Sequence, residues 1–512
     1  MRFDPTFIAS QTPDREAIVI GTQRWNYSTL DGFSTDWACR LFDGGMQQGD
    51  VVAILADNRA EFLGLCWAAQ RSGLYYLPVP SRLTAGEVNY ILEDSGAKVL
   101  VCDPAHADLA RNASQDIESI LVMALDAPPP PSKSLDAPAA IEGGDMLYTS
   151  GTTGKPKGVR RPLSLAPLGS QAKRVERGEQ LFGFSSDTRF LSPAPLYHAA
   201  PLRFAMNLLR TGACVVGMKR FDPTEALALI EREQITHSQW VPTMFSRILQ
   251  LPYEERQGFN LSSHQVAIHA GAPCPRSVKQ AMIEWWGPIL HEYYSGTESV
   301  GFTHITSQEW LERPGSVGRP FGCTVHILDQ QGQELPPLAS GAVYFAGKGG
   351  LEYHGDPAKT RAVHDAQGRS TMGDLGYVDE DGFLHLTDRA HFTIISGGVN
   401  VYPSEVENAL MELPQVADCA VFGLPDQDLG EAVAAVVELN DVNATSNEAV
   451  AQRLSDLLKS SLSGPKRPRL WRFAKIERTE TGKVQKAALR EACLQGGTML
   501  DLRAKSPCPT IT

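Results

Sequence analysis

Hydroxyl, glycine and lysine side chains are concentrated in the segment YTSGTTGKPKGV, residues 148–159. A loop of this composition can surround a polyphosphate with backbone N–H groups and hydroxyls, while Lys155 and Lys157 screen its charge. The apolar residues Met146 and Leu147 indicate a strand that runs into the loop. The spacing of glycines and lysine excludes a Walker A motif, and Pro156 follows the lysine where that motif needs serine or threonine. The segment is a candidate phosphate loop, with a flexible surface loop as the alternative.

Two further segments place small and polar residues directly after predicted strands. Residues 266–270 lead into Gly271–Pro273, and residues 289–294 lead into Ser295–Glu298. In open α/β sheets, ligands bind beyond the carboxyl ends of parallel strands. These two ends are therefore candidate walls of one site. Plain βα turns are the alternative, and they explain Gly271–Pro273 equally well.

Alternating strands and helices are expected to position these segments. Asp222, Pro223 and Glu225 have the spacing of a helix start. The consecutive prolines within residues 126–140 exclude a helix and predict a surface connection. Alternation of this kind favours a parallel α/β sheet. The predicted elements of the first part are strands at 50–55, 74–79 and 98–102 and helices at 61–72 and 82–95.

The pattern of apolar and turn-forming residues changes after residue 318. Short alternating segments separated by glycine and aspartate predict antiparallel strands up to about residue 388, in a small barrel-like part. A compact module follows, with strands at 392–395, 399–402 and 433–439 and helices from 403 and at 447–459. We therefore predict an α/β protein with a large domain of βα-layered sheets (1–388) and a small, mobile α+β domain (389–512).

Bulk composition limits the function classes. The chain has 512 residues, 42% hydrophobic and 21% charged, with a net charge of −12, which argues against nucleic acid as a partner. Its nine cysteines are scattered without a Cys-x-x-Cys pair, so structural zinc and disulfides are not expected. No signal peptide or membrane-spanning run is recognisable. A cytoplasmic protein is expected, and a homodimer remains open.

The segment at 148–159 resembles the phosphate loop of the adenylate-forming superfamily, which contains acyl- and aryl-CoA ligases, adenylation domains of peptide synthetases and beetle luciferases. Companion segments occur in the family's order over nearly the whole chain. They are PLYH at 195–198, YSGTE at 294–298, GD at 373–374, DR at 388–389, SGGVNVYP at 396–403 and TGK at 481–483.

The resemblance implies roles for individual residues. Catalysis would fall to Lys483, Thr297, Glu298 and Arg389, and Mg²⁺ would be held by Glu298 and Thr152. The residues implied for ATP and AMP are Thr149, Ser150, Gly151, Thr152, Thr153, Gly154, Lys155, Lys157, Gly271, Ala272, Pro273, Tyr294, Ser295, Gly296, Thr297, Asp374, Arg389 and Lys483. Those implied for the acid are His198, Trp240, Met244, Ala270, Gly271, Tyr293 and Gly296. Those implied for coenzyme A are Ser396, Gly397, Gly398, Lys466 and Arg467, and the hinge residue is His391.

The implied chemistry needs these residue types. Attack of a carboxylate on the α-phosphorus of ATP brings negative charges together, so neutralisation and positioning are required. Glu298 offers the oxygen ligands that Mg²⁺ prefers, and Lys483 can bridge the carboxylate and the α-phosphate. Asp374 can accept hydrogen bonds from both ribose hydroxyls. Taken alone, each is also an ordinary surface or turn residue, and Lys466 and Arg467 fit a solvated basic loop equally well.

The hinge departs from the family's usual residues, because His391 stands where lysine or aspartate is common, and Phe392 where an acidic residue is common. We hypothesise that a titrating histidine at this pivot makes the second half-reaction pH-dependent. Superimposable pH–rate profiles of the wild type and His391→Lys would exclude this.

The main reading is an ATP-dependent carboxylic acid–CoA ligase that forms an acyl-AMP and then a thioester. The pocket-side stretches 240–245, 270–272 and 293–296 are apolar or small and contain no cation. They predict a hydrophobic acyl, aryl or alicyclic acid. The alternatives are an acyl-AMP ligase that loads a carrier protein, a luciferase-like oxygenase, and an inactive nucleotide-binding relative.

Overall fold

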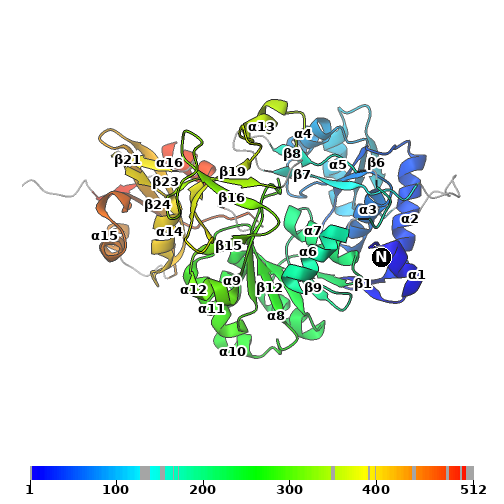
Figure 1. Cartoon of the computed structure of the whole chain (residues 1–512), viewed down its shortest axis with the longest axis horizontal. Helices are drawn as coiled ribbons and strands as arrows, with labels where there is room; N and C mark the ends of the chain where they lie inside the picture. The colour runs from blue at the N-terminus through cyan, green and yellow to red at the C-terminus, as the bar shows by residue number, and fades with distance from the viewer. Residues whose placement is uncertain are drawn as a thin grey trace, which may run out of the picture.

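The structure, a computed structural model, describes residues 3–126, 139–149, 156–164, 166–170, 172–347, 352–389, 393–397, 399–440, 446–479, 484–495 and 499–502. The described strands form three sheets (Figure 1). None of the helices in these ranges combines the length and the apolar character that a bilayer crossing requires.

The first sheet has seven strands and carries the approach to the phosphate loop. Its order is β18-β8-β7-β4-β3-β5-β6, with the strands from β7 to β6 parallel to one another. The strands predicted at 50–55, 74–79 and 98–102 are confirmed. The bounds are β3 (Val51–Leu55), β4 (Tyr75–Pro78), β5 (Val99–Cys102), β6 (Leu121–Ala124), β7 (Gly144–Thr149), β8 (Lys157–Arg160) and β18 (Glu352–Tyr353).

The second sheet has thirteen strands in the order β16-β17-β19-β20-β15-β14-β13-β12-β11-β9-β10-β1-β2. Its parallel part is formed by β1 (Glu16–Ile20), β9 (Arg189–Ser192), β10 (Cys214–Gly217), β11 (His237–Trp240), β12 (Val266–His269) and β13 (Leu290–Tyr294), and β2 (Gln23–Asn26) closes that edge. The predicted antiparallel part is confirmed and continues the same sheet. It comprises β14 (Thr303–Thr306), β15 (Ser316–Pro320), β16 (Thr324–Leu328), β17 (Gly341–Ala346), β19 (Ser370–Val378) and β20 (Leu384–Arg389).

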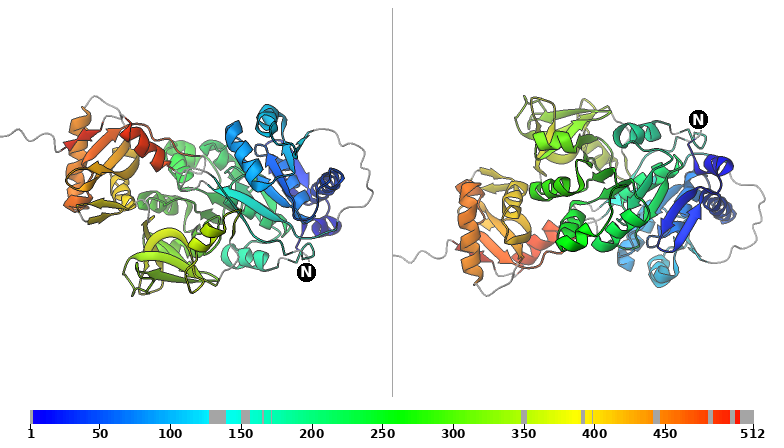
Figure 2. Two further views of the ribbon diagram at one scale, coloured as in Figure 1. Left: turned by 90° about the horizontal axis from the view of Figure 1, so that it is seen from above. Right: turned by 90° about the horizontal axis from the view of Figure 1, so that it is seen from below.

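The third sheet has six strands and lies with its helices at one end of the molecule (Figure 2). The elements at 416–426, 470–473, 486–494 and 500–501 were not predicted, whereas the strands at 394–396, 399–401 and 430–439 and the helices at 403–411 and 447–457 were expected near their observed positions. The strands are β21 (Ile394–Ser396), β22 (Val399–Val401), β23 (Val416–Asp426), β24 (Gly430–Leu439), β25 (Leu470–Phe473) and β26 (Leu500–Asp501), and the helices are α14 (Pro403–Met411), α15 (Asn447–Leu457) and α16 (Lys486–Leu494).

Helices pack against the sheets, and capping side chains and prolines mark where some of them begin. The predicted start at Asp222 is confirmed, because its carboxylate accepts from the N–H of Glu225 at 2.9 Å and Pro223 occupies the first turn. The remaining helices are α1 (Pro5–Gln11), α2 (Tyr27–Asp43), α3 (Ala60–Gln70), α4 (Ala85–Ser95), α5 (Ala107–Ser114), α6 (Ala172–Phe182), α7 (Ala199–Leu209), α8 (Pro223–Arg232), α9 (Pro242–Leu249), α10 (Tyr253–Gln257), α11 (Arg276–Trp286), α12 (Ser307–Glu312) and α13 (Pro357–Ala362).

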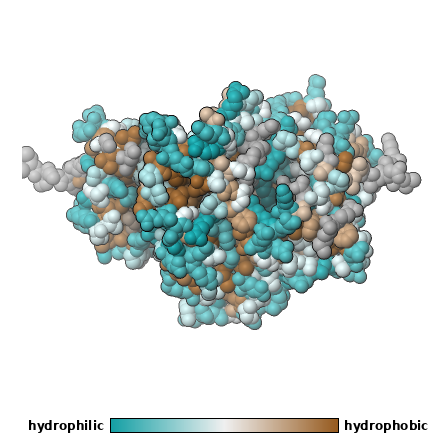
Figure 3. All heavy atoms as spheres, viewed as in Figure 1, coloured by the Kyte–Doolittle hydropathy of each residue, from teal (hydrophilic) through white to brown (hydrophobic). Residues whose placement is uncertain are grey.

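The parallel part of the thirteen-stranded sheet is covered on both faces. Ile268 and Tyr293 point into the core that contains α3 and α7, whereas Ala267 and Leu290 point into the core beneath α9 and α11. Side chains along a strand alternate between the faces, so this assignment fixes the side to which every neighbour on β12 and β13 points. On the outer surface in Figure 3, hydrophilic residues dominate, and a hydrophobic area lies near the junction of the third sheet with the antiparallel strands.

Candidate active site

Two strand ends meet at the carboxyl edge of the parallel part. β12 and β13 are parallel neighbours, and they lead into Gly271–Pro273 and Ser295–Glu298. Gly271 has φ 91°, a conformation that disfavours side chains, so the chain turns sharply where β12 ends. The structure thus brings together the two segments that the sequence marked as walls of one site.

Asp374 and Tyr294 form the first polar pair of this site. Asp374 is 7% exposed in β19, and its Oδ2 accepts from the Tyr294 hydroxyl. Asp374 lies directly opposite Arg389 in the antiparallel pair β19–β20, of which the backbone is described. A buried carboxylate fixed by a phenol is well placed to accept bonds from a diol. Three residues predicted for ATP and AMP, Tyr294, Asp374 and Arg389, are therefore neighbours.

Glu298 and Tyr353 form the second polar pair. The Tyr353 hydroxyl donates to Oε1 of Glu298 at 3.1 Å, and β18 carries Tyr353 there by pairing with β8. A Cβ at residue 296 would lie 2.8 Å from Oε2 of Glu298 and 2.7 Å from the sulfur of Met372, so glycine leaves this carboxylate its space.

The donor set fits Mg²⁺ held largely by substrate phosphates. Within the described ranges, no three histidine, cysteine, aspartate or glutamate side chains gather as a metal cage. Mg²⁺ at nucleotide sites is usually bound by one or two protein oxygens plus phosphates and water. Glu298 supplies such an oxygen, and the predicted second ligand, Thr152, lies outside the described residues.

Replacing Tyr353 by phenylalanine tests this pair. Loss of the bond to Glu298 leaves its carboxylate less well oriented, and we expect the Mg²⁺ concentration for half-maximal pyrophosphate exchange to rise roughly 10-fold. A magnesium titration of the exchange rate at saturating ATP measures it. Tyr253→Phe, at a tyrosine that is 65% exposed, is the matched control. Identical magnesium dependence in wild type and Tyr353→Phe would contradict the role.

Arg203 of α7 ties the loop after β13 to the first sheet. Its guanidinium bonds Asp145 of β7 at 2.6 Å and donates to the carbonyl of Thr297 at 3.0 Å and to Oγ of Ser299 at 3.1 Å. Ser299 has φ 51°, an uncommon conformation for a non-glycine residue. One side chain therefore fixes Thr297 relative to the strand that runs into the phosphate loop.

The strand before the phosphate loop is anchored by Tyr148. Its hydroxyl donates to Asp94 of α4 at 2.5 Å. Burial, followed by this bond to a carboxylate, raises the pKa of Tyr148 above its ordinary range, so the phenol stays protonated. Ser150–Lys155 lie outside the described residues, and Lys157 opens β8 on the far side of the loop.

The residues predicted for the acid pocket do not all share one face. Ala270 and Tyr293 lie on the α7 side, where Tyr293 stacks on Phe302 with ring centroids 5.2 Å apart. His198 caps α7, and its ring lies 4.5 Å from that of Tyr197. Trp240 and Met244 instead pack in the core beneath α9 and α11 with Phe245, so the structure does not bring them together with Tyr293.

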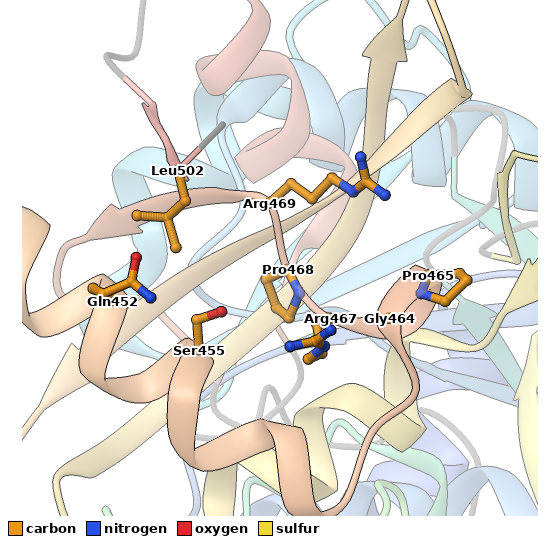
Figure 4. A pocket seen from close by; sticks show the side chains of 8 residues that line it. All are labelled: Gln452, Ser455, Gly464, Pro465, Arg467, Pro468, Arg469 and Leu502. Atoms are coloured by element: carbon orange, nitrogen blue, oxygen red, sulfur yellow. The ribbon is translucent and has the colours of Figure 1, made fainter. Parts of the chain in front are cut away.

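The predicted coenzyme A residues lie in the third sheet and its loops. Gly397 has φ 57°, and Ser396 is buried. Lys466 is held by Glu405 at 2.7 Å, so its charge is already paired. Arg467 lines a groove of about 430 Å³, in which α15 and the segment 464–469 face each other (Figure 4). Its Nε is shielded from solvent and meets no acceptor among the described residues.

Several predicted site residues lie outside the described residues. They are Ser150, Gly151, Thr152, Thr153, Gly154, Lys155, His391, Gly398 and Lys483. Conversely, sequence reasoning missed Tyr353 and Arg203, whose partners are distant along the chain and which carry no local motif.

Comparison with known proteins identifies the family of the chain. The AMP-binding enzyme family matches residues 7–352, and the AMP-binding enzyme C-terminal domain matches residues 405–483. A feruloyl-CoA synthase from Amycolatopsis is 32% identical, with 95% of this chain and 97% of the relative covered. A long-chain-fatty-acid–CoA ligase from Mycobacterium tuberculosis is also 32% identical, with 91% and 93% covered.

Solved structures have the same fold. The amide bond synthetase McbA from Marinactinospora thermotolerans superposes with a TM-score of 0.82 at 29% identity, over 93% of this chain and 97% of the other. The o-succinylbenzoate CoA synthetase MenE from Bacillus subtilis, in complex with its acyl-adenylate intermediate, gives a TM-score of 0.81 at 27% identity, over 96% and 98%. The chain belongs to the AMP-binding enzyme family, within the adenylate-forming superfamily.

Proposed function

We propose that the chain is an ATP-dependent carboxylic acid–CoA ligase that acts through an acyl-adenylate. The observation that carries the proposal is the pairing of Asp374 with Tyr294 and of Glu298 with Tyr353 beyond β13, next to the strand that leads into the phosphate loop. The names of the relatives, a feruloyl-CoA synthase and a long-chain-fatty-acid–CoA ligase, support the same reaction class.

In the first step, a carboxylate oxygen of the acid attacks the α-phosphorus of ATP, and the bond to pyrophosphate breaks. Asp374 holds the ribose, and the segment 150–155 covers the phosphates that leave. Lys483 and Arg389 neutralise charge around the α-phosphate. Glu298 and Thr152 would hold Mg²⁺, which would supply further charge neutralisation when bound.

In the second step, the thiol of coenzyme A attacks the acyl carbon, gives its proton to solvent, and AMP leaves. The carboxyl-terminal domain, 389–512, turns about His391 against the domain 1–388, so that Lys483 withdraws and the thiol enters beside Ser396–Gly398. The groove at Arg467 can accept phosphate groups of coenzyme A, because its Nε lacks an acceptor among the described residues.

The substrate in this proposal is a hydrophobic acyl, aryl or alicyclic acid. Tyr293 and Phe302 offer a stacked aromatic wall for it. The protein binds the acid, ATP and coenzyme A, and it acts as a monomer or a homodimer. A reducing cytoplasm suits the eight cysteines within the described ranges, which are all free thiols.

A panel of acids tests the proposal. Acid-dependent exchange of pyrophosphate into ATP, followed by chromatography of products formed with coenzyme A, a carrier protein or an amine, identifies both half-reactions. We expect an acyl-CoA and stoichiometric AMP. Exchange with transfer only to a carrier protein would favour the alternative of an acyl-AMP ligase, and absence of exchange with every acid would favour a binding protein.

A further inference from the structure

Arg177 of α6 is partly buried, and no carboxylate of the described residues pairs with its guanidinium. Its central carbon lies 3.6 Å from the centroid of the Phe302 ring and 5.8 Å from that of Phe321. Nη2 is shielded from solvent, and among the described residues no acceptor meets it. Stacking on the aromatic ring accounts for the position of the group, but it leaves this donor unused.

Four other arginines with little exposure are paired with carboxylates instead. Arg59, Arg71, Arg203 and Arg210 each form an ion pair with an aspartate or glutamate, at 2.6–2.8 Å. At Arg177, burial lowers the pKa, and the neighbouring positive charge of Arg161 acts in the same direction. A guanidinium nevertheless stays protonated in proteins. Within the described ranges, this partly desolvated charge therefore meets no anion that an ion pair or hydrogen bond joins to it.

Arg177 lies beside the aromatic side chains proposed to border the acid. Phe302, over which it stacks, is itself stacked on Tyr293 with an angle of 9° between the rings. Tyr293 also contacts Phe204 of α7, the helix that begins after His198. The aromatic wall thus ends at the guanidinium of Arg177. Sequence reasoning found no cation here because it considered only residues 240–245, 270–272 and 293–296, whereas Arg177 comes from a helix between them and the phosphate loop.

We propose that Arg177 binds an oxygen acceptor on the acyl part of the substrate, so that the preferred acid carries a second, anionic oxygen group beyond its aromatic or aliphatic body. This inference rests on the proposed ligase function and narrows its substrate class. The planar fork of the guanidinium suits a carboxylate, which can accept two parallel hydrogen bonds. An acid without this group would leave the buried donor unsatisfied in the complex, and such a mismatch discriminates strongly between substrates.

Matched acids test the inference on the full chain. Cinnamic acid is compared with 4-carboxycinnamic acid, and decanoic acid with decanedioic acid, by pyrophosphate release with coenzyme A and MgATP. We expect the wild type to favour the second member of at least one pair by roughly 10-fold to 100-fold in kcat/KM. Arg177→Met is expected to abolish the preference through a higher KM for the dicarboxylate, with little change for the plain acid. Arg177→Lys, which keeps the charge, is expected to retain part of it.

Lys173→Met is the matched control, because Lys173 is an exposed cation on the same helix. Equal losses for both members of each pair in Arg177→Met would mean a structural role and overturn the inference, as would a wild type that activates plain acids equally well. Calorimetric binding of the two acids in the presence of AMP reads out the same preference without turnover. If binding shows the preference while no thioester forms, the ligase function fails and the subsite stands.

Discussion

Replacing Lys483 by alanine is expected to lower the adenylation rate roughly 10³-fold, because the ammonium that neutralises charge between the attacking carboxylate and the α-phosphate is lost. Thioester formation from supplied acyl-AMP is expected to remain largely intact, since the proposed turn of the carboxyl-terminal domain withdraws Lys483 in that step. Pyrophosphate exchange measures the first half-reaction, and release of AMP from acyl-AMP and coenzyme A measures the second.

Contacts between residues that flank Lys483 support the local structure in the Lys483→Ala variant. Arg478 and Val484, which flank the segment 480–483, form a bridge, and Arg478 is held by Asp418 at 2.5 Å. The described residues on either side of this segment are thus joined to each other. Lys475→Ala, at an exposed lysine of the same module, is the control and should change neither half-reaction. Equal losses in both half-reactions of Lys483→Ala would show that the two steps do not divide their residues as proposed.

The fold was predictable wherever local patterns agree with the packing. Continuous apolar runs such as residues 51–55 are buried on both faces of a parallel sheet, so their strands could be recognised without any knowledge of their neighbours. β23 was missed although it is long, because residues 416–426 mix apolar residues with Asp418, Gly423 and Pro425. Its identity as a strand depends on its antiparallel pairing with β24, which is a tertiary contact.

The residues of the candidate site were likewise predictable where they lie in local motifs, and not where distant contacts place them. Tyr294 and Asp374 could be marked because they lie in short motifs, and the pairing that joins them emerged only from the structure. Tyr353 and Arg203 reach the site through contacts over 55 and 94 residues of sequence, which leave no local spacing to recognise. The sequence could not show that Trp240 packs beneath α9 and α11 while Tyr293 packs on the α7 side, because the face of a strand end cannot be assigned until the register of the strand is known.

Arg210→Met is expected to destabilise the fold by about 3–5 kcal/mol, because it leaves the buried carboxylate of Glu142 without its positively charged partner. Arg210 and Glu142 are 2% and 1% exposed, and they form two hydrogen bonds at 2.9 and 2.8 Å. Glu142 also accepts from Gln70 at 2.6 Å and from the N–H of Gly169 at 2.9 Å. The pair joins α7 to the residues just before β7, so it supports the approach to the phosphate loop. The midpoint of urea unfolding, followed by tryptophan fluorescence, measures the loss.

Two further variants separate the buried charge from the loss of an arginine as such. Arg111→Met breaks an ion pair whose side chains are 72% and 86% exposed, and it should cost less than about 1 kcal/mol. The double variant Arg210→Met/Glu142→Leu removes both buried charges, and it should recover much of the stability that the single variant loses. If the double variant is as unstable as Arg210→Met, then the packing of Arg210 over Trp67, and not the uncompensated Glu142, determines the cost.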